Sequence, residues 1–252
     1  MKDIRSTLIK TSPTMLTAWG LLWASRLLAS IRLDTPFATA VVWLTNSADV
    51  IGTIVLGLGL VALLIVRAPL AWRRSLRDVA THVSVVGLLL GGGALANEYL
   101  LKPSLAVPRP NIVRLAAEDA LGMTAQRFYE SMTKEERQQY LGHVLIATGD
   151  PTVSLTSEVR AHWICEAGYS LPSGHAFSAM LLATYFLAMG TAVARRWRRW
   201  FFYLLPPWAV LVGWSRVALR VHRPEDIVLG GLIGLLLGAV AFALARRFLR
   251  GE

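Results

Sequence analysis

The sequence predicts an all-α integral membrane bundle of six transmembrane helices, with a partly helical extracytoplasmic cap between helices 3 and 4. Of the 252 residues, 54% are hydrophobic and the mean hydropathy is +0.49, which is too apolar for an ordinary soluble domain. Six apolar segments are long enough to cross a bilayer as helices. One long polar segment, 103–172, separates the third from the fourth. We therefore expect residues 1–252 to form a single membrane domain, with 103–172 as its inserted outer-face cap.

The predicted spans follow the apolar segments and take these bounds: 14–31, 47–66, 79–101, 174–194, 200–219 and 225–245. Between the first two, residues 36–45 predict a short interfacial helix that carries Trp43. The Pro206-Pro207 pair predicts a kink or a break in the fifth span, because proline has no N–H to donate within a helix.

The sixth span carries a stripe of small residues, Gly230, Gly234 and Gly238, one every four positions. Such a stripe allows a second helix to approach closely. Asp226 continues the stripe by one step, so helical spacing turns it toward the bundle interior. The neighbouring Glu225 is rotated by about 100° and should point away.

Positive charge predicts the topology. Clusters of lysine and arginine at the N-terminus, between spans 2 and 3, between spans 4 and 5, and at the C-terminus all fall on one side of the predicted membrane: Lys2, Arg5, Lys10, Arg67, Arg73, Arg74, Arg77, Arg195, Arg196, Arg198, Arg199, Arg246, Arg247 and Arg250. The positive-inside rule then places both termini in the cytoplasm. Because the net charge of +10 is divided among these short clusters, it favours lipid headgroups over nucleic acid as the partner.

Three short clusters specify eleven positions in a fixed order, and the predicted topology places all of them at the outer face. The first follows span 3, the second opens span 4, and the third joins span 5 to span 6: Lys102, Arg109 and Pro110; Pro172, Ser173, Gly174 and His175; Ser215, Arg216, His222 and Asp226. A joint match of this size has a chance probability on the order of 10⁻⁸ if residues are independent and equally frequent. The clusters therefore predict one shared site.

The residue types suit transfer of a phosphoryl group. Lys102, Arg109 and Arg216 supply cationic donors for phosphate oxygens. Ser173 and the backbone N–H groups of Gly174 and His175 open a helix, where the helix dipole also favours an anion. A metal site built from His175, His222 and Asp226 is an alternative, but the surrounding cations would repel a metal ion, so we expect neither metal nor cofactor.

His222 stands four residues before Asp226, a spacing that lets the carboxylate orient one ring nitrogen and leave the other as a nucleophile. His175 lies on another helix and could donate a proton to the leaving oxygen. Spacing alone does not decide which histidine has which role. We interpret His82, His143 and His162 as structural or solvated, because we assign none of them a matched carboxylate spacing.

The cap is predicted to contain two helices. The pattern Thr133-Lys134-Glu135-Glu136 is typical of a capping box that starts a helix reaching about Ile146. A second helix is expected over about 157–165, with Trp163 on its apolar side. Because a long ordered loop is usually functional, we expect the cap to cover the site.

All eleven positions resemble the clusters of the type 2 phosphatidic acid phosphatase superfamily, which also includes soluble vanadium haloperoxidases. The resemblance implies an all-helical bundle, no metal requirement, His222 as a nucleophile that forms a phosphohistidine, Asp226 as its orienting partner and His175 as the general acid. It also implies that a phosphate cradle is formed by Lys102, Arg109, Ser173, Gly174 and Arg216.

The chain length, the six spans and the run Arg160-Ala161-His162-Trp163 before Gly168-Tyr169 resemble the bacterial phosphatidylglycerophosphatase B type of this superfamily. This resemblance implies a multi-pass protein of the bacterial inner membrane. The implied substrates are phosphatidylglycerol phosphate, undecaprenyl diphosphate and related lipid phosphates. A lipid-to-lipid phosphotransferase and a lipid transporter or flippase remain alternatives, and the sequence does not indicate an oligomeric state.

Overall fold

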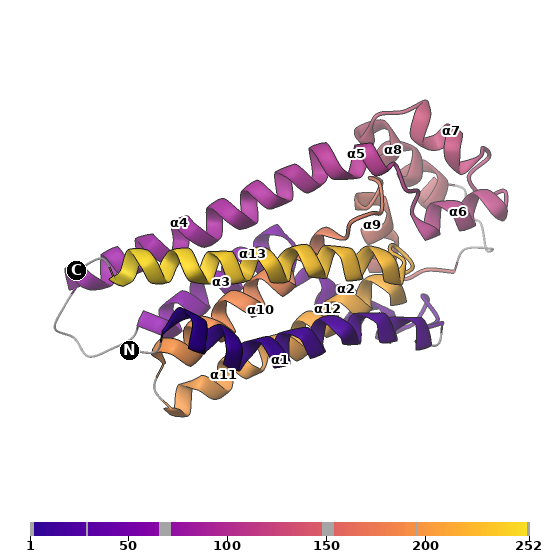
Figure 1. The fold of residues 1–252 in the computed structure, drawn as a ribbon. Coiled ribbons are helices and arrows are strands. Elements are labelled where there is room, and N and C mark those ends of the chain that lie inside the picture. Colours follow the sequence, from indigo (N-terminus) through magenta and orange to yellow (C-terminus); the bar gives the residue numbers. More distant parts are fainter. Residues whose placement is uncertain (1–2, 29, 66–71, 148–153, 195, 251–252) are drawn as a thin grey trace.

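The computed structural model describes residues 3–28, 30–65, 72–147, 154–194 and 196–250, and within these ranges it contains helices and no strand (Figure 1). The predicted all-α fold class is confirmed. The bundle is formed by α1 (Ile4–Leu22), η1 (Trp23–Leu27), α2 (Pro36–Asn46), α3 (Val50–Ile65), α4 (Trp72–Ala96), α10 (Gly174–Val193), η4 (Arg196–Arg198), α11 (Arg199–Tyr203), α12 (Leu205–Ala218) and α13 (Pro224–Arg250). The segment from α4 to α10 contains η2 (Asn97–Leu101), α5 (Lys102–Leu105), α6 (Pro110–Ala117), α7 (Ala125–Glu130), α8 (Lys134–Gly142), η3 (His143–Ala147) and α9 (Ser157–Cys165).

Helix α10 lies at the centre of the bundle and packs against α1, α3, α4, α11, α12 and α13. Its closest neighbour is α13, which presents the predicted glycine stripe. A Cβ atom added at Gly230 would lie 2.3 Å from the Ser173 carbonyl oxygen, and one at Gly234 would lie 2.3 Å from the Phe177 carbonyl oxygen. The stripe therefore lets the two backbones touch, and it sets the height of Ser173 relative to the start of α13.

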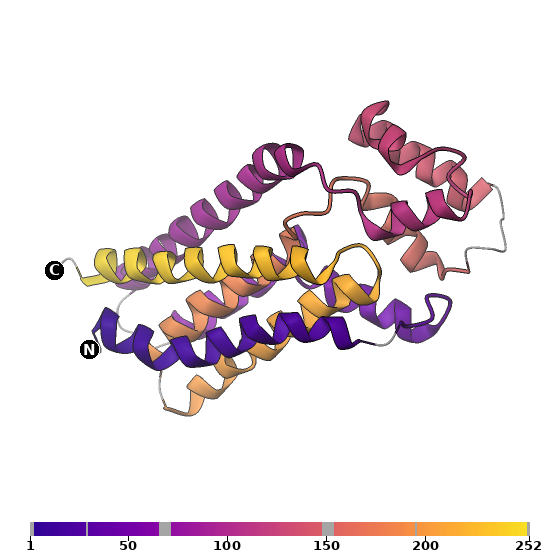
Figure 2. The same cartoon turned by 45° about the vertical axis from the view of Figure 1, so that its right-hand side comes forward.

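Both chain termini lie at one end of the bundle, and α6 to α9 gather at the other end (Figures 1 and 2). Helix α4 lies beside α13 near the terminal end and diverges from it toward the cap in both views. The π-helix η2 and the short α5 continue α4 to Ala106, whose positive φ of 49° ends the helix. This extension brings Lys102 to the cap.

The cap segment has a hydrophobic core of its own, formed by α6 to α9 together with α2 and the residues that follow α12. Trp163 is fully buried in this core, and its indole N–H donates to the Leu219 carbonyl oxygen at 2.9 Å. The Thr133 capping box is present at the start of α8, and α9 has the bounds expected from the sequence. Both predicted cap helices are confirmed, and Trp163 attaches the second of them to the bundle.

The number of membrane spans is confirmed only in part. Among the described residues, three helices are long and apolar enough to cross a membrane: 76–105, Gly174–Val193 and Pro224–Leu249. Helices α2 and α3, bent by 60°, meet the same criterion as a pair. The short helix expected over 36–45 is present as α2, while its interfacial position and the six spans remain predictions.

The structure changes the predicted ends of the first span and locates the predicted break in the fifth span. The first helix begins at Ile4, before the predicted start at residue 14. It ends at Leu22, before the predicted end at residue 31, because a 3-10 turn follows it. At the expected break in the fifth span, α11 ends at Tyr203 and α12 begins at Leu205, with the two prolines in its first turn, where no N–H is required. Several predicted positions lie outside the described residues: 29 and 66 of the spans, 148–153 of the cap, and the cations Lys2, Arg67 and Arg195.

Candidate active site

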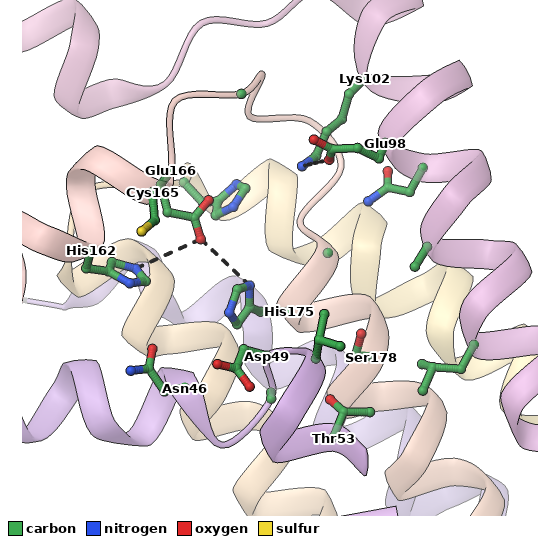
Figure 3. Close-up of a pocket in the computed structure, with 18 of the residues that line it drawn as sticks. Asn46, Asp49, Thr53, Glu98, Lys102, His162, Cys165, Glu166, His175 and Ser178 are labelled. Carbon is green, nitrogen blue, oxygen red and sulfur yellow. Dashed lines mark hydrogen bonds and ion pairs between the residues drawn. The ribbon is translucent and has the colours of Figure 1, made fainter. Parts of the chain in front are cut away.

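A cavity of about 1150 Å³ opens where the bundle meets the cap (Figure 3). Its walls come from α2, α3, α4, η2, α9 and the start of α10. Five predicted site residues line it: Lys102, Arg109, Gly174, His175 and His222. The opposite part of the lining, between α3 and α4, is mainly apolar. The cavity therefore has a charged end beside the cap and an apolar end within the bundle.

Helix ends hold the three clusters in place. Arg109 is the N-cap of α6, and Ser173 is the N-cap of α10, where its hydroxyl accepts from the Ala176 N–H at 3.4 Å. Arg216 lies in the last turn of α12, and Asp226 lies in the first turn of α13. The Ser173 backbone N–H donates to the Asp226 carbonyl oxygen at 3.0 Å, which joins the second cluster to the third.

The His222 ring is buried between Arg109 and Asp226. Its Nε2 lies 3.1 Å from Nη1 of Arg109, and its Nδ1 lies 3.3 Å from Oδ2 of Asp226. A guanidinium group has donors and no acceptor, so Nε2 must offer its lone pair and Nδ1 must carry the proton. Burial and the Arg109 charge lower the pKa of His222 to about 3. His222 is therefore neutral near pH 7, with its lone pair facing the cationic side of the site.

Asp226 is held from several directions, as a positioning group requires. Its Oδ2 accepts hydrogen bonds from the Ser170 hydroxyl and, at 2.8 Å, from the Arg223 backbone N–H. Ser170 also lies 3.3 Å from Nδ1 of His222. Asp226 is 1% exposed, whereas Glu225 is on the surface and pairs with Arg26. The predicted inward orientation of Asp226 and outward orientation of Glu225 are confirmed.

The two buried arginines share one carboxylate, Glu166, which directly follows α9. Nη2 of Arg109 lies 2.6 Å from Oε2 of Glu166, and Nη2 of Arg216 forms an ion pair with Oε1. Arg109 also donates to the Gly168 carbonyl oxygen at 2.8 Å and to the Val221 carbonyl oxygen at 3.0 Å. Two carbonyl oxygens therefore hold the Arg109 guanidinium, and the Glu166 carboxylate lies between it and the guanidinium of Arg216.

Glu166 lies between two histidines, and Figure 3 shows the carboxylate between His162 and His175. Oε1 is 4.0 Å from Nε2 of His162 and 3.9 Å from Nδ1 of His175. The Arg109 and Arg216 charges outweigh the opposing effect of burial, so the pKa of Glu166 is well below its usual value. The ionised Glu166 carboxylate is therefore bound by two guanidinium groups, beside His162 and the candidate His175.

Lys102 lies across the cavity from Glu166, on the extension of α4 (Figure 3). Its ammonium group lies 2.7 Å from Oε2 of Glu98, one turn earlier in the π-helix η2. Single π-helical turns inside longer helices are frequent at functional sites. The structure thus brings Lys102, Arg109, His175 and His222 to one cavity. Arg216 bonds to Glu166, which lines the same cavity, whereas Lys102 bonds to Glu98.

A comparison with protein families matches residues 81–250 to the PAP2 superfamily. The chain belongs to the PAP2 superfamily. The match contains all three clusters. Among individual proteins, the chain is similar to "Phosphatidylglycerophosphatase B" of Escherichia coli strain K12, of Escherichia coli O157:H7 and of Shigella flexneri, each 31% identical over 165 residues. These residues are 66% of this chain and 60% of each relative, so the chain spans less than two thirds of their length.

One sequence interpretation within this PAP2 domain holds only in part. His162 is structural and not solvated, because its side chain is 8% exposed and its Nε2 lies 2.8 Å from Nη1 of Arg216, which also places it at the site. Burial and the Arg216 charge lower its pKa to about 3. The signal was present in the sequence: Glu166 follows His162 by four residues, the spacing that singled out His222 and Asp226. His82, buried against Tyr185, and His143, exposed on the cap, agree with the structural and solvated interpretations.

Three more residues at this PAP2 site were not identified from the sequence. Glu166 carried a signal, as described above, but Ser170 and Glu98 did not. Ser170 lies in an irregular segment before the second cluster, and no periodicity connects it with Asp226. Glu98 falls within the apolar pattern of span 3, where the π-helical turn changes the face that it would present in a regular α-helix.

Proposed function

We propose that this protein is an integral-membrane lipid phosphatase that removes phosphate from phosphatidylglycerol phosphate, undecaprenyl diphosphate or related lipid phosphates through a phosphohistidine intermediate. The observation that carries the proposal is the neutral His222 ring, whose Nε2 lone pair faces Arg109, one of the two arginines that hold the Glu166 carboxylate. Membership of the PAP2 superfamily and the similarity to phosphatidylglycerophosphatase B support it.

The first half of the reaction uses the two histidines. A substrate phosphate replaces the Glu166 carboxylate between Arg109 and Arg216, and the Nε2 lone pair of His222 attacks phosphorus. The bond from phosphorus to the lipid oxygen breaks and its electron pair stays on that oxygen. His175, whose protonated form is favoured by the negative charge of the incoming phosphate, supplies a proton to it. The arginines and Lys102 stabilise the charge on the other phosphate oxygens, with Ser173 and the Gly174 backbone completing the cradle.

The second half returns the enzyme to its starting state. Neutral His175 takes a proton from a water molecule, whose oxygen attacks phosphorus. The bond from nitrogen to phosphorus breaks, inorganic phosphate leaves, and the electron pair returns to Nε2 of His222. Asp226 holds the proton-bearing Nδ1 throughout, so the ring keeps one tautomer and one orientation.

The apolar part of the cavity favours a lipid as the substrate. Residues of α3 and α4, including Ile54, Leu90 and Leu95, line it next to the charged end. Added Cβ atoms at Gly87 and Gly91 would meet no atom within 4 Å, so this part of the lining has open space. An acyl or prenyl chain could lie there with its phosphate at the arginines. We place the protein in the bacterial inner membrane, with its termini in the cytoplasm and its site facing outward.

The test is phosphate release by the purified full chain in detergent, with lipid phosphates as substrates and a metal chelator present. We expect His222→Ala to lower kcat at least about a thousandfold, because the nucleophile is lost. The matched control is His143→Ala, which removes an exposed cap histidine and should keep parental activity. A phosphoryl group trapped from labelled substrate on the parent but not on His222→Ala would support the intermediate. Parental turnover by His222→Ala would refute it.

A further inference from the structure

A second cationic group lies beside the site and belongs to the cap. Glu98 in η2 accepts two ion pairs: its Oε2 is 2.7 Å from the Lys102 ammonium and its Oε1 is 2.5 Å from the Lys134 ammonium. Lys134 is the first residue of α8, so this carboxylate connects the extension of α4 to the cap. Two cations share one anion, and the three-residue group keeps a net positive charge.

The group lies directly next to the arginine cradle. A Cβ atom added at Gly168 would be 3.6 Å from Oε1 of Glu98 and 3.8 Å from Cε of Lys134. The carbonyl oxygen of the same glycine accepts a hydrogen bond from Nε of Arg109 at 2.8 Å. Gly168 therefore lies close to both the lysine group and Arg109, and both line the same cavity.

The two sets of cations differ in exposure. Arg109 and Arg216 are at most 2% exposed and surround the position of the phosphate that is cleaved, whereas the Lys134 side chain is 41% exposed. A headgroup with a single phosphate would be neutralised by the inner cations. A second phosphate joined to the first would extend beyond that cradle, toward the partly exposed ammonium group. Such a phosphate could take the place of Glu98 as the partner of Lys134.

We propose that Lys134 is a specificity-determining residue that binds the second, uncleaved phosphate of headgroups carrying two phosphates. The ligand is either the phosphodiester of a lipid such as phosphatidylglycerol phosphate or the inner phosphate of a prenyl diphosphate. Glu98 holds the ammonium in place until that phosphate arrives. This inference rests on the proposed phosphatase function and adds a substrate preference to it.

The experiment compares three substrates with the full chain in detergent: phosphatidylglycerol phosphate, a prenyl diphosphate and, as the substrate with one phosphate, phosphatidic acid. We expect Lys134→Gln to raise KM about tenfold for the first two and to change it less than about twofold for phosphatidic acid, because one hydrogen bond between charged groups is lost. Lys134→Arg should retain most of the preference. Arg127→Gln, which removes an exposed cap charge, should change none of the three values.

The outcomes separate the inference from the function on which it rests. No phosphate release by the parent from any substrate would refute the phosphatase itself. An equal loss on all three substrates would overturn the specificity role, since Lys134 would then only support the cap. Unchanged KM values would overturn it as well. A rise for only one of the two-phosphate lipids would identify which arrangement of phosphates Lys134 binds.

Discussion

Glu166→Gln tests the proposal that the two buried arginines bind the substrate phosphate. The amide keeps the shape of the side chain and removes its charge, which leaves Arg109 and Arg216 without their shared carboxylate. Removing one partner of a buried ion pair costs about 3–5 kcal/mol of stability, because the remaining charge stays buried. The same change removes the competitor of an incoming phosphate. We therefore expect a variant that is less stable in phosphate-free buffer and binds phosphate more tightly.

The gain in phosphate binding follows from the ion pairs that the parent must break. A hydrogen bond to a charged group contributes about 1.5–3 kcal/mol, so relief from even one such bond corresponds to about tenfold or more in affinity. The assay measures the inhibition constant of inorganic phosphate against hydrolysis of phosphatidic acid, with thermal unfolding followed at increasing phosphate. Bound phosphate should restore much of the stability lost in the variant.

The control and the pH dependence sharpen this test. Glu118→Gln removes a carboxylate that pairs with Arg114 on the cap surface, and it should leave phosphate inhibition unchanged. Because the pKa of Glu166 is well below 4.5, the parent carboxylate should still compete at pH 5. Phosphate inhibition of Glu166→Gln that is equal to or weaker than that of the parent would refute the view that Glu166 occupies the phosphate position.

Three further predictions concern the apolar end of the cavity, the contact between α10 and α13, and pH. Gly91→Leu should obstruct the apolar end of the cavity and lower kcat/KM about tenfold for long-chain lipid phosphates but not for a short-chain phosphate. The control is Gly92→Leu, which lies outside the cavity lining and should leave kcat/KM unchanged for both. Gly234→Ala should separate α10 from α13 and cost about 1–3 kcal/mol in unfolding, and an unchanged melting temperature would contradict the packing described. His162 and His222 have folded pKa values of about 3 against 6.5 unfolded, so the unfolded state binds more protons between these values. Stability should be constant above about pH 6.5 and fall below it, by about 2 kcal/mol per histidine at pH 5, and substituting either histidine by Asn should reduce the slope in thermal unfolding.

The sequence predicted well those features that depend on local pattern. The α9 bounds, the Thr133 capping box and the break before Leu205 follow from helix-start signals and proline chemistry, which act within a few residues. The inward orientation of Asp226 follows from helical periodicity along one helix. In each case the information lies within one or two turns, so no tertiary contact was needed.

The features that were missed depend on packing between distant segments. Glu166 contacts Arg109 and Arg216 only because the cap core places the end of α9 over the end of α12, through contacts such as that of Trp163 with Leu219. The long first helix was placed too late because its first turns are polar, while the structure extends them to Ile4. Hydropathy measures the preference of a segment for lipid and contains no information about which helices pair.

The charge balance around Arg109 and Arg216 explains why one carboxylate in the cap matters for a site formed largely by the bundle. The Arg109 and Arg216 side chains are at most 2% exposed. Without a counter-ion, two guanidinium groups buried in this way would destabilise the fold by several kcal/mol. Glu166 supplies that counter-ion, and it does so from an element that is joined to the bundle by the cap core rather than by the bundle helices. A phosphate dianion can replace it and leave the arginines at least equally neutralised. The cap thus neutralises the two arginines with a group that the phosphate of the proposed substrate is chemically suited to displace.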